Sequence, residues 1–405
     1  MEVFQVLKSF RLGNHRSFRD EHELLLMPAL PGDDRTAVPV AAIYGANASG
    51  KSNLLDGLAF MVSAVRYSFS RWGSESAPRR PFRLDPAARE RPSVFVAEFV
   101  AGDVPYTYGF TLDDTEVREE WLYSFPEKRK RIVFERTGAA IRFGSTVADT
   151  KAKLDVLEEL IRPNVLLLSV CASLKLDQLM PAYDWFRAVP ELLPSQAASM
   201  PSSSLAQRLA HFVEGPQDRS DLLMPLLSAA DVGITGIDVI KTTDPKNGRR
   251  YYDVRFRHGA DYERFELNDE SAGTRSWLEL LLVLLPVLDT GSLALVDELD
   301  RSLHPLLTAK LIGLFKDPET NPHGAQLIFT THDTSLLGTM LGDQVLDRDQ
   351  IWFVEKQADG ASTLYPLTDF KPRKEQNTER RYLAGSYGAV PVLDRQDFVD
   401  AVLGR

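Results

Sequence analysis

The segment "GANASGKS", residues 45–52, places two glycines, a lysine and a hydroxyl at the spacing G-x-x-x-x-G-K-S. Glycines let backbone N–H groups curl around phosphates, a lysine reaches the outer phosphates, and a serine hydroxyl can bind Mg²⁺. We therefore expect Lys51 to contact the β- and γ-phosphates of ATP and Ser52 to bind Mg²⁺. The alternative is a glycine-rich turn with an exposed lysine. The residues expected to surround the phosphates are Gly45, Ala46, Asn47, Ala48, Ser49, Gly50, Lys51, Ser52 and Asn53.

Two carboxylates and a histidine that could complete such a site occur late in the chain. Asp297 and Glu298 directly follow the apolar run 293–296, and His332 follows the apolar run 327–329. Side chains at the carboxyl ends of parallel strands face the crevice in which open α/β sheets bind ligands. We expect Asp297 to hold Mg²⁺, Glu298 to act as the general base for water, and His332 to contact the γ-phosphate. Taken alone, "DELD" could be an acidic loop and His332 an ordinary surface residue.

The segments around these residues predict the elements that position them. Residues 38–45 are almost entirely apolar, which is typical of a strand buried on both faces of a parallel sheet. After the glycine motif, Leu54, Leu58, Val62 and Val65 recur at helical spacing. The order strand, glycine loop, helix is the context that a phosphate-binding loop requires, because the helix N-terminus adds positive potential.

A Ser-x-Gly pair, Ser271 and Gly273, opens a long apolar helix and precedes the apolar run 293–296 by about twenty residues. The simple reading is a serine cap before a core helix. With the glycine motif before it and "VDELDRSLHP" and "FTTHDTSLL" after it, the pair resembles the signature motif of ABC-type ATPases. The resemblance implies that Ser271 and Gly273 complete the site of a second subunit, so that two chains enclose two ATP molecules. It also implies that Asp300 lies in a loop between the two sites.

The chain resembles the branch of ABC-type ATPases that includes the SMC, RecF and OLD proteins, and more closely the RloA-like bacterial ATPases, often named AAA-family proteins. Further segments on which this resemblance rests are "NHRSFRD", "EEWLYSFP", "YDWF" and "RRYLAGSYGAVPVL". The resemblance implies anti-phage defence together with a separate effector, such as a nuclease. Arg16 holds the position of a basic residue that approaches the nucleotide in some relatives; a solvated loop arginine is the alternative. Relatives carry a glutamine that senses Mg²⁺ where we align Ser173, and the nearest glutamine is Gln178.

Composition limits the remaining classes. The 405 residues carry 47 Lys and Arg against 57 Asp and Glu, a net charge of −10, which argues against general adhesion to nucleic acid or anionic membranes. DNA contact would have to be local. A single cysteine excludes an intrachain disulfide, and neither a signal peptide nor a membrane-spanning run is evident, so we expect a cytoplasmic protein.

We predict an α/β fold, a P-loop ATPase head of the ABC type with a β-rich lobe and a helical insertion. The expected organisation is an N-terminal half (1–150), a helical insertion (151–230) and a C-terminal half (231–405). Residues 81–143 alternate as antiparallel strands do. Two alternatives to an ATP-hydrolysing, dimer-forming head remain: a RecF-like clamp in which ATP gates DNA binding, and a nucleotide-dependent scaffold with negligible turnover. The motifs do not distinguish ATP from GTP.

Overall fold

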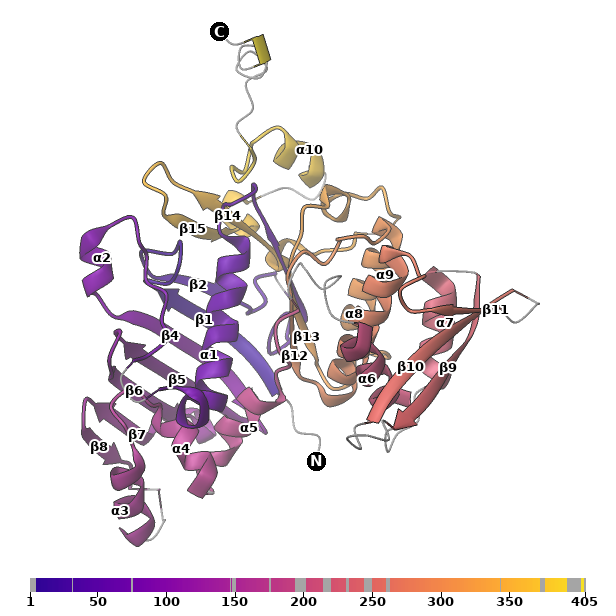
Figure 1. Cartoon of the computed structure of the whole chain (residues 1–405). Coiled ribbons are helices and arrows are strands. Elements are labelled where there is room, and N and C mark those ends of the chain that lie inside the picture. The colour runs from indigo at the N-terminus through magenta and orange to yellow at the C-terminus, as the bar shows by residue number, and fades with distance from the viewer. Residues whose placement is uncertain are drawn as a thin grey trace.

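The protein has a mixed α/β fold built on three sheets (Figure 1). The computed structural model describes residues 5–30, 32–73, 76–145, 147, 151–174, 176–193, 202–213, 220–230, 233–243, 250–259, 263–342, 344–371, 376–391 and 402–403. None of the helices within these ranges is long and apolar enough to cross a membrane.

The central sheet positions the candidate site. Its order is β12-β13-β3-β14-β15, with the first four strands parallel to one another and β15 antiparallel. The strands are β3 (Val40–Tyr44), β12 (Leu293–Val296), β13 (Gln326–Thr330), β14 (Ile351–Lys356) and β15 (Ser362–Pro366). Parallel strands end at the same edge of a sheet. The glycine loop after β3, the carboxylates after β12 and the histidine after β13 therefore meet at one edge.

Both faces of this sheet are covered, which explains why its strands are apolar without interruption. Ala41 and Ile43 of β3 face a core shared with helix α1 (Lys51–Arg71), whereas Val40, Ala42 and Tyr44 face the opposite core. The opposite core is formed with helices α8 (Ala272–Thr290) and α9 (Pro305–Lys316). Successive side chains of a strand point to opposite faces, so a strand between two cores needs apolar residues at every position.

A larger antiparallel sheet packs on the α1 side, in the order β2-β1-β4-β5-β6-β7-β8. The expected β-rich region supplies its last five strands, and two strands from the N-terminus complete it. Its strands are β1 (Gln5–Gly13), β2 (His22–Leu25), β4 (Ser93–Ala101), β5 (Val104–Leu112), β6 (Val117–Ser124), β7 (Arg131–Thr137) and β8 (Ala140–Phe143). The short helix α2 (Pro86–Glu90) precedes β4.

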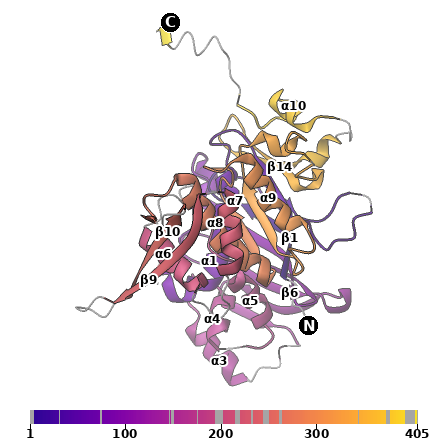
Figure 2. The same cartoon turned by 90° about the vertical axis from the view of Figure 1, so that its right-hand side faces the viewer.

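The third sheet, in the order β11-β10-β9, lies on the far side of α8 from the large sheet (Figures 1 and 2). Its strands are β9 (Ile234–Thr243), β10 (Arg250–His258) and β11 (Glu263–Glu266). The helices between the halves divide: α4 and α5 pack on α1, whereas α6 and α7 pack on α8 and this sheet. They are α3 (Lys151–Leu160), α4 (Leu167–Leu174), α5 (Met180–Ala188), α6 (Ser202–Val213) and α7 (Ser220–Ala230). The division of the chain at residues 150 and 230 stays a prediction.

Candidate functional site

The glycine loop joins β3 directly to α1, and two of its positions exclude larger residues. A side chain at Gly45 would collide with the Val354 carbonyl, and one at Gly50 would collide with the Ser362 and Ser17 hydroxyls. Gly50 also has a φ of 116°, in the left-handed region that favours glycine, and it precedes α1 without any side-chain cap. The Gly50 carbonyl accepts from the N–H groups of Asn53 and Leu54, so the preceding N–H groups at the start of α1 have no acceptor within the helix, as an anion-binding helix N-terminus requires.

Lys51 is buried at the base of this loop, where its Nζ donates to the carbonyls of Gly45 at 2.7 Å and Ala46 at 3.1 Å. Burial lowers the pKa of Lys51 to about 8, an effect that the nearby carboxylates of Asp297, Glu298 and Asp300 partly offset. An ammonium group that has lost water and carries a depressed pKa gains free energy when an anion reaches it. The arrangement therefore favours a negatively charged ligand in the loop.

Asp297, at the end of β12, contacts the start of α1. Ser52 Oγ donates to Asp297 Oδ1 at 3.0 Å, and Thr330 Oγ1 donates to the same oxygen at 2.6 Å. A hydroxyl beside a carboxylate suits Mg²⁺, which takes oxygen ligands and is usually held by one or two carboxylates together with phosphates and water. The part of the chain that the structure describes contains no cluster of three or more His, Cys, Asp or Glu side chains able to hold a metal.

Thr330 is a residue of this site that we did not identify from the sequence. Its buried hydroxyl donates to Asp297 and accepts from the Glu298 N–H at 2.7 Å. Glu298 has a φ of 54°, a left-handed conformation that costs free energy in a non-glycine residue. The Thr330 hydroxyl therefore fixes both the metal-ligand candidate and the backbone of the general-base candidate. Its position at the end of a strand, in "FTTHD", was the available signal.

His332 lies at the same edge, exposed above the loop. The backbone N–H of His332 donates to Asp300 Oδ1 at 3.4 Å. Partial burial and the charge of Lys51 lower the pKa of His332, although Asp300, Glu298 and Asp297 act in the opposite sense. A histidine with a pKa below its ordinary value of about 6.5 is mostly neutral at pH 7. His332 can therefore meet an oxygen of a phosphate as a neutral hydrogen-bond donor. The structure thus brings Lys51, Asp297 and His332 to one side of the molecule.

The loop is supported from behind by polar side chains of β15 and of the β1–β2 connection. The Ser362 hydroxyl hydrogen-bonds with the Ser49 carbonyl and with the Ser17 hydroxyl, which in turn accepts from Asn53 Nδ2 at 2.7 Å. Asn53 thus faces this support. Arg16 contacts Asp56 of α1 through two nitrogens, at 2.5 and 2.7 Å. Arg16 is therefore bound to α1. The sequence had suggested either a contact with the nucleotide or a solvated loop arginine.

Ser271 and Gly273 lie at the N-terminus of α8, where the Ser271 hydroxyl accepts from the Thr274 N–H at 3.1 Å. Ser271 is exposed, and a Cβ at Gly273 would lie 2.9 Å from the Ser302 carbonyl of the loop that follows Asp300. Ser271 therefore presents a helix N-terminus to the surface.

The alignment that placed Ser173 near the metal is wrong. Ser173 belongs to α4, which packs on the last turns of α1, where the Ser169 hydroxyl accepts from the Phe69 N–H at 3.2 Å. Phe69 lies about 27 Å along the helix from Lys51. The segment beside β12 is instead that of Leu193, whose carbonyl accepts from the Asp297 N–H at 2.9 Å. Backbone hydrogen bonds of this kind leave no side-chain pattern, which is why the sequence misled us.

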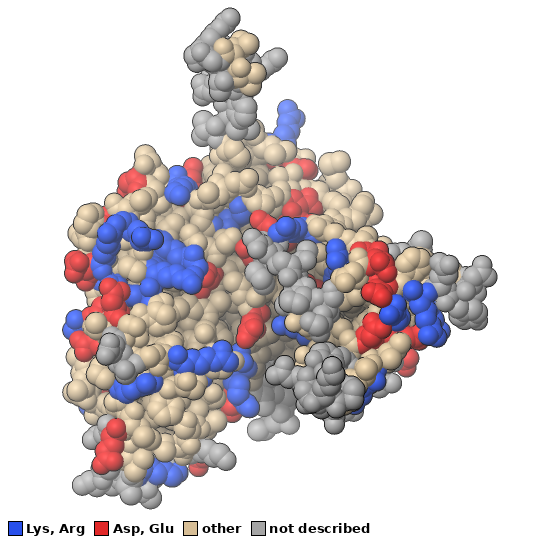
Figure 3. Space-filling model, viewed as in Figure 1, with Lys and Arg blue, Asp and Glu red and all other residues tan. Residues whose placement is uncertain are grey.

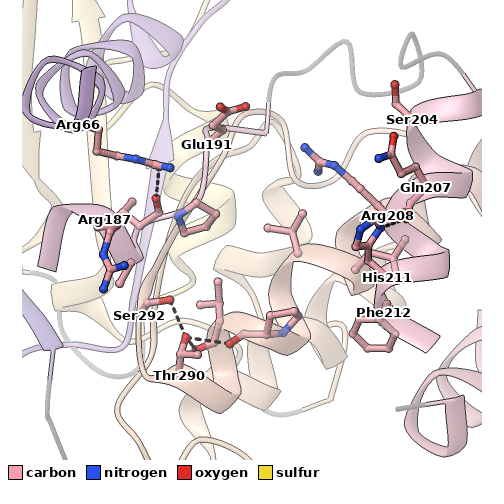
Figure 4. A pocket seen from close by; sticks show the side chains of 17 residues that line it. Arg66, Arg187, Glu191, Ser204, Gln207, Arg208, His211, Phe212, Thr290 and Ser292 are labelled. Carbon is pink, nitrogen blue, oxygen red and sulfur yellow. Dashed lines mark hydrogen bonds between the residues drawn. The ribbon is translucent and has the colours of Figure 1, made fainter. Parts of the chain in front are cut away.

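A cavity of about 1110 Å³ lies away from this edge, between the C-terminal parts of α1 and α8 (Figure 4). Arg66, Arg187, Arg208 and His211 line it. Arg66 donates to the Val189 carbonyl at 3.1 Å, which holds α1 against the chain that follows α5. The cavity lies near Ser292, just before β12 begins, and thus at the opposite edge of the central sheet from the glycine loop.

Comparison with known proteins identifies the family. Residues 40–338, more than half of the chain, match the family described as "AAA domain, putative AbiEii toxin, Type IV TA system". The chain belongs to this AAA-domain family. The matched range runs from the strand before the glycine loop to just beyond His332. The fold is accordingly that of a P-loop NTPase, and the family is one of ATP-binding proteins; the ABC type and the likeness to RloA-like proteins stay predictions.

Solved structures similar to this AAA-domain protein include SMC heads. The head domain from Thermotoga maritima is 15% identical, with 89% of this chain and 98% of that chain covered and a TM-score of 0.42. An SMC head bound to the C-terminal winged-helix domain of ScpA is 15% identical, with 90% and 99% covered and a TM-score of 0.47. The Pyrococcus furiosus head with an extended coiled coil, bound to the ScpA C-terminal domain, is 13% identical, with 91% and 98% covered and a TM-score of 0.45. A search of curated proteins gives no match.

Proposed function

We propose that the protein binds Mg·ATP in the loop of residues 45–53 and hydrolyses it to ADP and phosphate. The observation that supports this most directly is the contact of Ser52 with Asp297 at 3.0 Å, beside the buried Lys51. A hydroxyl, a carboxylate and an ammonium group converge there on the free N-terminus of α1. Triphosphate and Mg²⁺ together match that set of charges.

Each residue then has a distinct role in the proposed reaction. Lys51 and the N–H groups that open α1 bind the phosphates, and Ser52 and Asp297 hold Mg²⁺, which neutralises charge on the phosphates. Glu298 accepts a proton from the attacking water, and neutral His332 donates to the γ-phosphate. The P–O bond to the leaving β-phosphate breaks as the bond from water forms. Positioning and charge neutralisation supply most of the rate in such transfers.

Phosphate release and ATP binding, measured side by side, test this proposal. We expect Lys51→Ala to lose ATP binding, and Glu298→Gln to retain binding while hydrolysis falls by about 10²- to 10⁴-fold. Glu319→Gln, a change of the same kind at an exposed acid before β13, should match the wild type. Equal and near-zero turnover in wild type and Glu298→Gln would favour the scaffold reading instead.

We further propose that two copies enclose two ATP molecules, with Ser271 and Gly273 of each copy acting on the nucleotide of the other. The exposed, small-residue N-terminus of α8 supports this, because such an end can bind a phosphate. Light scattering of Glu298→Gln should show a dimer with Mg·ATP and a monomer without it. Adding Ser271→Arg should abolish the dimer, whereas adding Ser70→Arg, at the exposed far end of α1, should not.

The output of this cycle, we propose, is control of a separate effector in anti-phage defence. The family description, which names a toxin of a type IV toxin–antitoxin system, is in keeping with such a role. Affinity purification of the Glu298→Gln protein from native cells, with and without ATP, should recover one further chain in a nucleotide-dependent manner. Recovery of no other chain in either state would contradict effector control.

A second candidate, an ATP-gated DNA clamp, is favoured by a local basic surface around α2 (Figure 3). Arg80, Arg83, Arg89 and Arg91 are exposed there, and Arg80 approaches Asp56 of α1 at 3.7 Å. A salt-dependent shift of labelled duplex by the purified protein with ATP, lost on changing Arg83 and Arg89 to Gln, would favour this candidate. The absence of any shift at low salt would leave effector control as the function.

A further inference from the structure

The strand that precedes the glycine loop also contacts the segment that carries His332. Tyr44 ends β3, directly before Gly45, and its hydroxyl donates to the Asp333 carbonyl at 3.0 Å. His332 and Asp333 lie just beyond the end of the neighbouring strand β13. The proposed reaction assigns no role to this contact, although it joins the phosphate-binding strand to the histidine segment.

The contact continues the pairing of β3 with β13 on the far side of His332. Before the histidine, the Thr331 N–H donates to the Ile43 carbonyl at 3.2 Å, which extends the parallel ladder of the two strands. After the histidine, the Tyr44 hydroxyl binds the Asp333 carbonyl. The backbone of His332 therefore lies between two hydrogen bonds to β3.

These two bonds matter because little else fixes the direction of the histidine. The side chain of His332 is exposed, so packing around its ring does little to hold it. Its backbone N–H is 3.4 Å from Asp300 Oδ1, which is longer than most hydrogen bonds of this kind. The ring therefore points where the backbone on either side of it is held.

The Tyr44 hydroxyl is itself well placed to act as a fixed donor. Its ring is fully buried and contacts the rings of Tyr382 and Phe353, with centroids 5.7 and 6.4 Å away. Burial raises the pKa of Tyr44 well above its ordinary value of about 10, and the charges of Asp333 and Asp300 act in the same direction. The hydroxyl therefore keeps its proton and donates it to the carbonyl.

The segment that Tyr44 contacts is folded as a small unit by its own hydrogen bonds. Asp333 Oδ1 accepts from the Ser335 N–H at 2.9 Å and from the Ser335 hydroxyl at 2.5 Å, which opens the 3₁₀ helix η3 (Thr334–Leu337). The Asp333 N–H donates to Thr331 Oγ1 at 3.0 Å. These bonds lie within the unit, whereas the Tyr44 hydroxyl fixes the unit against β3.

We propose that Tyr44 is a positioning residue for ATP hydrolysis: its hydroxyl holds the Asp333 peptide, so that His332 faces the γ-phosphate before the nucleotide arrives. This inference rests on the proposed function. Without that hydrogen bond the segment after β13 spends time in other positions, and a smaller fraction of complexes has His332 aligned for the reaction. Nucleotide binding depends mainly on Lys51 and the N–H groups that open α1, which the Tyr44 hydroxyl does not contact through this bond.

Tyr387 provides a matched control. It is fully buried and stacks on the same Phe353 ring at 5.8 Å, yet its hydroxyl has no hydrogen-bond partner among the described residues. Tyr44→Phe and Tyr387→Phe therefore remove the same atom from similar surroundings, and only the first removes a contact with the histidine segment. A general effect of packing would appear in both variants.

We would measure three quantities for both variants and the wild type: the kcat for phosphate release, the Kd for ADP, and amide hydrogen exchange of residues 332–337 without nucleotide. Tyr44→Phe should lower the kcat about three- to tenfold, the loss expected for one buried hydrogen bond. Its Kd for ADP, which lacks the γ-phosphate, should stay within about twofold. Exchange of residues 332–337 should be faster than in Tyr387→Phe, which should match the wild type throughout.

Combining Tyr44→Phe with His332→Ala tests whether Tyr44 acts through the histidine. His332→Ala alone should lower the kcat, and adding Tyr44→Phe should then cost less than about twofold more, because residues that act as one unit are not additive. An undiminished loss in the His332→Ala background would overturn the proposal, since Tyr44 would then act on another group.

The outcomes separate this inference from the function on which it rests. Equal kcat or equal exchange in Tyr44→Phe and Tyr387→Phe would overturn the role of Tyr44 while leaving ATP hydrolysis intact. Unfolding of Tyr44→Phe, or a Kd for ADP raised as much as the kcat is lowered, would show a purely structural residue and also overturn it. If the wild type did not hydrolyse ATP, the proposed function would fail, and the exchange measurement would still decide whether Tyr44 holds the segment.

Discussion

Replacing Thr330 with valine separates catalysis from nucleotide binding. Valine has nearly the same shape, so the end of β13 keeps its packing while the hydroxyl is lost. The two hydrogen bonds that disappear are the one donated to Asp297, at 2.6 Å, and the one accepted from the Glu298 N–H, at 2.7 Å. The phosphate loop itself is unchanged, because Thr330 does not contact Gly45 or Lys51 through any of these bonds.

The size of the effect follows from these two contacts. A hydrogen bond to a charged group is worth about 1.5–3 kcal/mol, and a buried N–H left unpaired costs about 1–3 kcal/mol. The loss of free energy should be smaller than the sum of these two values, because the Ser52 hydroxyl still donates to Asp297. Without the Thr330 hydroxyl, the Glu298 N–H loses its acceptor, and the left-handed conformation of Glu298 is held less firmly. We therefore expect kcat to fall about 10- to 100-fold, equivalent to about 1.4–2.8 kcal/mol, and the Kd for ATP to change by less than about threefold.

Steady-state phosphate release and fluorescence titration with a labelled ATP analogue measure these two values. Thr308→Val is the matched control, since Thr308 on α9 is fully buried and its hydroxyl has no partner among the described residues. It should leave both values unchanged. A kcat for Thr330→Val equal to that of Thr308→Val would refute the assignment of Asp297 and Glu298 to the reaction.

Further expectations concern charge, stability and register. Burial lowers the pKa of Lys51 to about 8, and bound phosphates would raise that pKa again. ATP affinity should therefore be constant below about pH 7 and fall by up to about tenfold per pH unit above pH 8, and calorimetry should show proton uptake on binding. An affinity that rises with pH would contradict this. Glu120→Ala should cost about 3–5 kcal/mol in urea unfolding, because it leaves the buried Arg136, 3.6 Å from its carboxylate, unpaired; a loss below about 1 kcal/mol would count against it. Ser173→Ala and Gln178→Ala should hydrolyse ATP at the wild-type rate, and a tenfold loss in either would restore the original alignment.

The sequence predicted those helices and strands in which apolar side chains recur at a regular spacing. The apolar run before Gly45 is a strand buried on both faces, the run after Lys51 is a helix, and Ser271 does cap the helix that follows it. Chemistry that depends on residue type at fixed spacing was equally visible, which is why Asp297 could be named in advance. These predictions needed only neighbours within one element.

What the sequence did not show depends on contacts between distant segments. Thr330 could not be recognised as the residue that fixes Glu298, because a threonine at the end of a strand is ordinary until the neighbouring strand is known. Leu193 contacts Asp297 through its backbone, and Ser362 reaches the Ser49 carbonyl across more than three hundred residues of chain. Strand order decides such contacts, and local patterns do not record it.

The central claim is that a nucleotide with Mg²⁺ binds where β3, β12 and β13 end. A crystal structure of the Glu298→Gln protein with Mg²⁺ and ATP tests it most directly. The account predicts phosphates on the N–H groups that open α1, Mg²⁺ between Ser52 and Asp297, and His332 at the γ-phosphate. A nucleotide bound elsewhere on the chain, with Lys51 still hydrogen-bonded to Gly45 and Ala46, would contradict it.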